Sequence, residues 1–188
     1  PPVARAGRRP APLVVGMESG MIRIRTEDDG VRVITLDRPD KRNAMTPEMF
    51  ARLREAVGEI GDSRALVLTG EGPVFCGGFD LKLCLDRPGT MRTLLTELSA
   101  LILELRSLDI PVVIAAHGAA LAGGCALLGG ADYVVTNDDA KLGYPVVRLG
   151  VSPAVSAPFL RQMIGNGRAR TRLLQGDLLT GKEAARLG

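Results

Sequence analysis

The segments FCGGFDL (residues 75–81) and HGAALAGGCA (residues 117–126) decide the fold of this 188-residue chain. Each follows a short run of apolar and β-branched residues, and each is expected to open onto a helix. Backbone N–H groups at the start of a helix have no intrahelical acceptor, and the helix dipole favours negative charge there. Glycine permits the positive φ angles and the close backbone approach that such turns need. Two of these turns brought together would aim a pair of N–H groups at one oxygen, as stabilisation of an oxyanion requires.

The sequence on either side of these two glycine turns alternates between strand and helix patterns. A hairpin signal lies at residues 27–30 (EDDG), and Thr46 followed by Pro47 is typical of a helix start. Short β-branched or apolar runs predict strands at residues 21–26, 31–36, 65–69, 111–116 and 133–136. Apolar residues at helical spacing predict helices at residues 47–60, 91–108, 123–130, 153–164, 169–175 and 181–187. The alternation predicts one α/β domain with largely parallel strands.

Composition and charge argue against nucleic acid as a partner. Aromatic residues make up 3% of the chain and Trp is absent, so bases would find few side chains on which to stack. The formal net charge of +3 equals the charge of Arg5, Arg8 and Arg9, which lie in a stretch without acidic residues. Residues 17–188 are therefore formally neutral. Phosphate recognition needs a basic face on the folded domain, and this composition does not predict one.

The pattern of cysteines and the length of the apolar runs indicate the cellular compartment. Cys76, Cys84 and Cys125 are odd in number and lack paired spacing, so we expect neither a disulfide framework nor a zinc site. This pattern favours a reducing, cytoplasmic location. No apolar run approaches the roughly 18 residues that a membrane-spanning helix needs. Residues 1–16 are expected to be a disordered leader or an appended segment, followed by one domain over residues 17–188.

Further motifs occur in an order that we know from one family. They are DRPDKRNAM (37–45), PVVIAAHGAALAGGC (111–125), ADYVV (131–135), LGYPVVRLG (142–150) and LTGKEAARLG (179–188). Over residues 21–188 the chain resembles the crotonase, or enoyl-CoA hydratase/isomerase, superfamily. The resemblance implies a spiral of ββα units, here with its C-terminal helical segment truncated. It also implies an acyl-CoA thioester as the partner and assembly as a homotrimer or hexamer. Coenzyme A would be part of the substrate, so no separate cofactor and no metal are implied.

The resemblance implies a role for particular residues. The backbone N–H groups of Phe79 and Gly123 would form an oxyanion hole for the thioester oxygen. Lys82 would meet a CoA phosphate as a point charge. The wall that binds CoA would comprise Lys41, Asn43, Ala44, Cys76, Gly77, Gly78, Lys82 and Gly124.

The chain departs from the family at the positions of the usual acid and base. A hydratase uses two carboxylates, and the matching positions here are Ala126 and Val146. A third position, where some relatives carry an aspartate, is Ala154. None of these side chains can transfer a proton, and general acid–base catalysis is worth about 10²–10⁴-fold. We therefore expect that hydration through the usual glutamate pair is absent.

Other polar residues near these motifs have simpler interpretations. His117 lies near Cys125 in the sequence, as a metal site or nucleophile would need, but no orienting third group is evident, so we expect it to steer the turn. Asp80 is expected to cap a helix. Three polar residues lie close in the sequence to the apolar acid–base positions: Tyr144, Arg148 and Ser152. A structural role is expected for each.

Two functions of different classes follow. The first is an acyl-CoA enzyme that stabilises a thioester oxyanion or enolate and carries out a reaction other than ordinary hydration. The alternative is a non-catalytic acyl-CoA carrier or regulatory module, because the acid–base positions are apolar. A serine hydrolase on a related spiral fold is a third possibility, but residues 150–154 (GVSPA) lack the final glycine of a nucleophile elbow.

Overall fold

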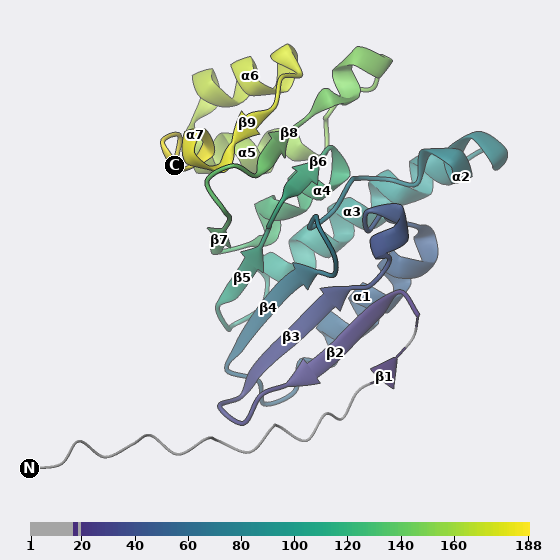
Figure 1. Cartoon of the computed structure of the whole chain (residues 1–188), viewed down its shortest axis with the longest axis vertical. Coiled ribbons are helices and arrows are strands. Elements are labelled where there is room, and N and C mark those ends of the chain that lie inside the picture. Colours follow the sequence, from purple (N-terminus) through teal and green to yellow (C-terminus); the bar gives the residue numbers. More distant parts are fainter. Residues whose placement is uncertain (1–16, 19) are drawn as a thin grey trace, which may run out of the picture.

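The computed structural model describes residues 17, 18 and 20–188 (Figure 1). The leader expected at residues 1–16 lies outside the described residues. The elements form one larger and one smaller sheet with helices packed around them, and the fold is mixed α/β as predicted.

The larger sheet has six strands in the order β1-β2-β3-β4-β5-β7. Strands β1, β2 and β3 pair antiparallel, whereas β3, β4, β5 and β7 pair parallel. The predicted hairpin joins β2 to β3, and Gly30 donates its N–H to the carbonyl oxygen of Glu27 at 2.9 Å. The strands are β1 (Met17–Glu18), β2 (Ile22–Thr26), β3 (Val31–Leu36), β4 (Ala65–Gly70), β5 (Val112–Ala115) and β7 (Tyr133–Val135).

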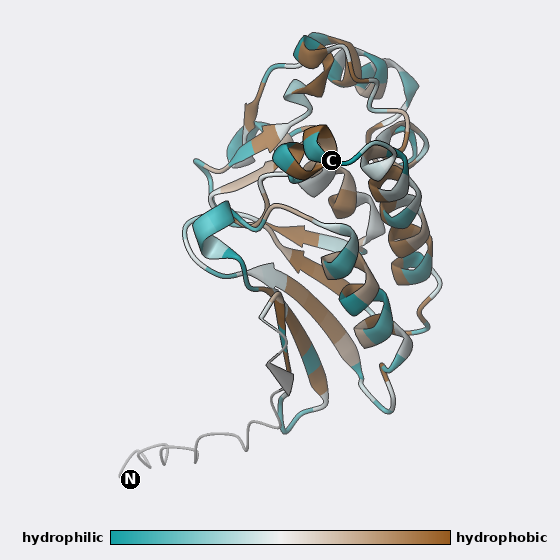
Figure 2. Ribbon diagram, turned by 90° about the vertical axis from the view of Figure 1, so that its right-hand side faces the viewer, coloured by the Kyte–Doolittle hydropathy of each residue, from teal (hydrophilic) through white to brown (hydrophobic). Residues whose placement is uncertain are grey.

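Two long helices, α1 (Pro47–Gly58) and α3 (Thr90–Arg106), pack together against this sheet (Figure 1). Helix α1 begins as predicted, because the Thr46 hydroxyl accepts a hydrogen bond from the Met49 N–H at 3.2 Å and Pro47 is the first helical residue. The apolar stripe of α3 is buried, with Leu94 and Leu98 at most 1% exposed. In Figure 2 the strands are mostly hydrophobic, whereas the helices alternate between hydrophobic and hydrophilic segments. The core therefore lies between the sheet and these helices.

A second, three-stranded sheet has the order β6-β8-β9, with β6 (Ala119–Leu121), β8 (Lys141–Gly143) and β9 (Leu179–Thr180). This sheet corrects one expectation. The second glycine turn does not step directly from strand to helix, because β6 lies between β5 and the short helix α4 (Gly123–Leu127). Strands β8 and β9 have no predicted counterpart, since two- and three-residue strands show no periodicity of their own.

The remaining elements are short helices around the second sheet. The helix expected at residues 153–164 begins three residues later, at Ser156, and follows a 3₁₀ segment. The C-terminal helices lie together at one end of the molecule (Figure 1). These elements are η1 (Pro39–Lys41), α2 (Leu81–Asp86), η2 (Leu128–Gly130), η3 (Pro145–Leu149), α5 (Ser156–Ile164), α6 (Asn166–Gln175) and α7 (Gly181–Ala185). Among the described residues, each helix is either too short or too polar to span a lipid bilayer.

Candidate active site

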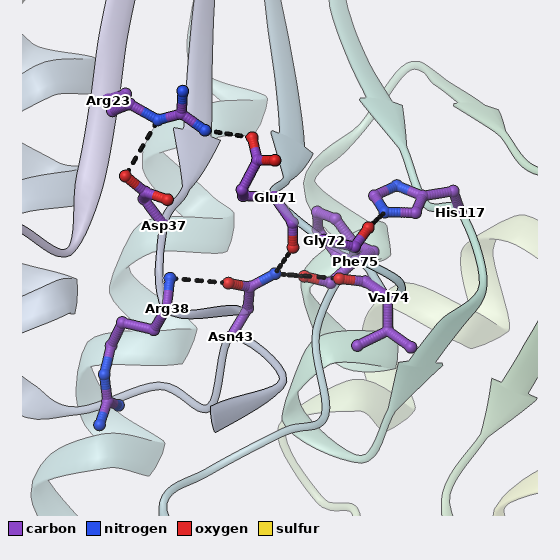
Figure 3. Close-up of polar contacts among 9 residues, drawn as sticks. All are labelled: Arg23, Asp37, Arg38, Asn43, Glu71, Gly72, Val74, Phe75 and His117. Atoms are coloured by element: carbon purple, nitrogen blue, oxygen red, sulfur yellow. Dashed lines mark hydrogen bonds and ion pairs between the residues drawn. The ribbon is translucent and has the colours of Figure 1, made fainter. Parts of the chain in front are cut away.

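The loop that carries the first glycine turn is held by one buried side chain, Asn43 (Figure 3). Its carbonyl oxygen accepts the main-chain N–H of Arg38 at 2.8 Å. Its amide nitrogen donates to the carbonyl oxygens of Glu71 and Val74, both at 2.9 Å, and of Phe75 at 3.0 Å. Asn43 is 0% exposed, so these contacts engage its whole side chain. The structure thus places Asn43 behind the expected CoA wall, where it positions the loop.

Two further residues, Arg23 and His117, make contacts that fix the same loop (Figure 3). Arg23 forms an ion pair with Asp37 at 2.9 Å and another with Glu71, which joins the ends of β3 and β4. His117, at the start of the second glycine turn, has its Nε2 atom 2.9 Å from the carbonyl oxygen of Gly72. His117 therefore ties the second glycine turn to the segment that leads into the first one.

The two glycine turns lie side by side. Cys76 forms a parallel bridge to β6, in which its N–H donates to the Ala119 carbonyl at 3.1 Å and its carbonyl accepts from Leu121 N–H at 3.0 Å. Segments that are about 40 residues apart in the sequence thus share a short ladder. This confirms that the fold brings the two turns together.

Glycine is required where the two turns touch. Gly78 has φ +103°, and a side-chain Cβ there would lie 3.0 Å from the Leu121 carbonyl oxygen and 3.6 Å from the Gly123 nitrogen. A Cβ at Gly124 would lie 2.6 Å from the carbonyl oxygen of Cys76, which is closer than real contacts allow. The close approach of the two backbones therefore depends on these residues.

The backbone directions leave the amides of Phe79 and Gly123 without protein partners. Met45 pairs with the residues on both sides of Phe79: Met45 N–H donates to Gly78 at 2.8 Å, and Asp80 N–H donates to Met45 at 3.0 Å. In a parallel bridge this leaves the N–H of Phe79 directed away from Met45. Gly123 is the first residue of α4, where no intrahelical acceptor exists. Within residues 20–188, neither amide donates to a protein acceptor.

Phe79 and Gly123 line one cavity of about 80 Å³. Two of the three apolar acid–base positions, Ala126 and Val146, line it as well. The third, Ala154, is exposed and is not part of the lining. Among the described residues, none that lines the cavity carries a carboxylate, and the hydroxyl groups of the lining come from Tyr144, Ser152 and Ser156. Ser156 was missed by the sequence analysis, since a serine near a helix start is ordinarily taken as a cap.

Tyr144 is the most unusual polar group of this wall. It is 6% exposed, and its hydroxyl lies 3.5 Å from the carbonyl oxygen of Cys125. Burial, and secondly the neighbouring Cys125, raise the pKa of Tyr144 well above 10. The phenol is therefore neutral at physiological pH, and its O–H can donate a hydrogen bond.

The buried cysteines are poor nucleophiles. Burial raises the pKa of Cys76 to about 12 and that of Cys125 to about 11. Because the thiolate is the reactive form, both thiols are inert near neutral pH. Cys76 and Cys125 are 0% and 9% exposed, so both pack as small apolar residues. No cluster of three or more His, Cys, Asp or Glu side chains among the described residues is arranged to hold a metal ion.

The other predicted residues flank the first glycine turn. Lys41 in η1 and Lys82 in α2 are exposed, and Ala44 is partly buried. Asp80 caps α2 as expected, because its side chain accepts the Leu83 N–H at 3.3 Å. Gly77 lines the cavity, whereas Cys76 and Gly78 are buried beneath it.

One residue that the sequence analysis did not single out supports this arrangement. Arg38 donates to the carbonyl oxygen of Ala44 and forms an ion pair with Asp80 at 3.3 Å. It thereby ties the segment after β3 to the helix that follows the first glycine turn. Nothing local in the sequence distinguishes this arginine from a surface one.

Comparison with known proteins places this geometry in context. A family model described as enoyl-CoA hydratase/isomerase matches residues 26–188. A probable enoyl-CoA hydratase of Rhodobacter capsulatus is 34% identical over 163 residues, which cover 85% of this chain and 63% of that protein. The crystal structure of an enoyl-CoA hydratase from Mycobacterium smegmatis matches with a TM-score of 0.84 and 29% identity, covering 89% of this chain and 67% of that one. AtuE of Pseudomonas aeruginosa matches with a TM-score of 0.82 and 35% identity, at 89% and 67% coverage. The chain thus spans about two thirds of the length of these relatives.

Proposed function

Because this chain belongs to the enoyl-CoA hydratase/isomerase family, we propose that it binds an acyl-CoA thioester and stabilises negative charge on the thioester oxygen. The observation that carries the proposal is the pair of unpartnered N–H groups, of Phe79 and Gly123, on one cavity. Preorganised donors of this kind stabilise a developing negative charge more strongly in a cavity than in water, because they need no reorganisation when the charge develops.

The CoA part of the molecule would lie along the first glycine turn. Lys41 and Lys82 are exposed cations on the two segments that meet at the bridge between Met45 and Phe79. Each would meet a phosphate as a flexible point charge. Gly77 would allow the backbone to approach the pantetheine, and the buried Asn43 would hold the loop in place.

The chemistry would be that of a thioester enolate without a carboxylate pair. The wall offers Ala126 and Val146 where a hydratase needs its acid and base, so ordinary hydration is not expected. Tyr144 is the buried hydroxyl nearest to these positions in the sequence, and its raised pKa keeps it a hydrogen-bond donor. We place the reaction among acyl-CoA conversions in the lyase or isomerase class that depend mainly on oxyanion stabilisation.

A non-catalytic acyl-CoA carrier or regulatory module is the second candidate. The absence of a carboxylate among the described lining residues favours it, because such a cavity could bind a thioester but would have no acid or base to transfer a proton. Incubation with crotonyl-CoA, followed through the absorbance of the conjugated thioester, separates the two. Binding with no conversion of this or other acyl-CoA substrates supports the carrier, and rapid hydration contradicts our interpretation of Ala126 and Val146.

The compartment and the assembly remain proposals. The three free cysteines favour a reducing, cytoplasmic location. Assembly as a homotrimer or hexamer is proposed from the family alone.

The oxyanion proposal is tested by removing the oxygen from the ligand, because the donors are main-chain atoms that no side-chain substitution deletes. Butyryl-CoA and its thioether analogue butyl-CoA differ only in the thioester carbonyl. Two hydrogen bonds at a net 0.5–1.5 kcal/mol each predict that butyryl-CoA binds about 5- to 150-fold more tightly. Isothermal titration calorimetry measures both affinities. Equal affinities would show that the thioester carbonyl accepts no hydrogen bond from the protein, which would contradict the proposal.

A further inference from the structure

Arg38 begins a chain of hydrogen bonds that ends at the Phe79 amide. Its Nη1 atom donates to the carbonyl oxygen of Ala44. The N–H of the same peptide unit, which belongs to Met45, donates to the carbonyl oxygen of Gly78 at 2.8 Å. The peptide unit that carries this carbonyl also carries the Phe79 N–H. Two peptide units therefore connect the Arg38 guanidinium to one of the two proposed oxyanion donors.

The planar peptide bond lets this chain set the direction of the last N–H. In a trans peptide unit the C=O and the N–H point in opposite directions. The hydrogen bond from Met45 to Gly78 thus fixes where the Phe79 N–H points. The hydrogen bond from Arg38 to Ala44 in turn holds the peptide unit that makes this contact. Rotation of either unit would turn the Phe79 N–H away from the thioester oxygen.

The Arg38 side chain is itself held at both ends. Its main-chain N–H donates to the buried Asn43 at 2.8 Å, and the side chain extends away from that contact (Figure 3). At the far end its Nη2 atom forms an ion pair with Asp80 at 3.3 Å. Asp80 follows Phe79 directly and caps α2, so the guanidinium is anchored beside the donor that it would position.

The charge of Arg38 has the sign that oxyanion stabilisation needs. Hydrogen-bonded groups in a chain polarise one another, by about 10–30% per bond. A cation that donates to the first carbonyl therefore makes the later N–H groups stronger donors. The side chains of Arg38 and Asp80 are 17% and 22% exposed, so water and salt screen this charge only partly.

We propose that Arg38 is a positioning residue of the oxyanion hole, which acts on the thioester oxygen through the peptide units of Ala44–Met45 and Gly78–Phe79. This inference rests on the proposed function and adds a residue to that same site. Arg38 does not line the cavity. Its loss should therefore weaken recognition of the carbonyl oxygen and leave recognition of the rest of the ligand unchanged.

The test measures the ratio of the affinities for butyryl-CoA and butyl-CoA by calorimetry, because a defect that affects both ligands cancels in this ratio. Arg38→Gln removes the cation and shortens the side chain. Arg38→Lys keeps the charge, but its single nitrogen cannot replace both contacts of the guanidinium fork. Arg54→Gln is the matched control, since the side-chain contacts of Arg54 among the described residues join α1 to Glu97 and Glu104 of α3. Thermal melting establishes which variants are folded, so that Arg38→Lys decides the question if Arg38→Gln does not fold.

The expected result is a loss of preference for the thioester. Loss of one of two carbonyl hydrogen bonds predicts that the Arg38 variants lower the affinity ratio about 2- to 12-fold. The C=O stretch of bound butyryl-CoA, isolated by infrared difference spectroscopy with an isotopic label at the carbonyl carbon, should move to higher frequency in the same variants. Arg54→Gln should lower the melting temperature and leave both readouts unchanged.

Two kinds of failure are distinguishable. If the unmodified protein prefers butyryl-CoA and the folded Arg38 variants keep that preference, or if Arg54→Gln changes it equally, the inference is overturned and the proposed function stands. If the unmodified protein binds the two ligands equally, the proposed function is contradicted and the inference with it.

Discussion

Asn43 shows how one residue organises the candidate site. It has φ +52°, in the left-handed region, where asparagine is tolerated better than most residues. It accepts from a residue five positions earlier and donates to carbonyls 28 to 32 positions later. A single amide thereby replaces a stretch of regular structure in holding the loop that leads to Phe79.

We predict that Asn43→Ala lowers the free energy of unfolding by about 3–5 kcal/mol, because three carbonyls and one N–H lose their buried partner. Denaturation in urea measures the change. Asn166→Ala, at an exposed position, is the control and should change stability by no more than about 0.5 kcal/mol. A comparable loss in both variants would contradict the central role of Asn43.

At the scale of elements, helix starts and glycine turns follow local rules, whereas the short strands do not. Helix α1 begins where Thr46 and Pro47 predict, and α7 begins with the capping box of Thr180 and Glu183. These signals involve neighbouring residues, so the sequence contains all the information they need. Strand β6 was missed, because a three-residue strand is stabilised by its partners, Cys76 and β8, and not by its own periodicity.

The cap of α1 gives a prediction at this scale. Thr46→Ala removes the acceptor of the Met49 N–H and should cost about 1 kcal/mol of stability. Thr171→Ala is the matched control, since Thr171 lies within α6 and donates only to the carbonyl of Gly167 in its own helix. Thermal melting compares the two. A Thr46→Ala protein as stable as the control variant would contradict the capping role.

At the scale of the whole molecule, the fold buries Cys76 and Cys125 beside the two glycine turns. Burial raises the pKa of both thiols, to about 12 and about 11, whereas the unfolded chain would ionise them near their ordinary values. Above about pH 9 the unfolded state therefore binds fewer protons than the folded state. By linkage, stability must then fall as the pH rises.

We predict that the free energy of unfolding decreases between about pH 9 and 11, by up to about 1.4 kcal/mol per pH unit for each buried thiol. Urea denaturation across this range measures the slope. Cys76→Ala removes one of the two thiols and should make the slope shallower. A slope that is unchanged by this substitution would show that other groups, such as Tyr144, cause the alkaline loss.

The sequence by itself determined the alternation of strands and helices, the two glycine turns and the apolar side chains at Ala126 and Val146. These features depend on local periodicity, local turn chemistry and residue identity, which neighbouring residues alone determine. Only the tertiary structure decided that Asn43 is buried, that Ala154 lies outside the cavity, and that Ser156 lines the same cavity as Tyr144 and Ala126. Those outcomes depend on which distant segments come into contact. The residues next to a side chain in the sequence do not reveal which distant residues it will contact.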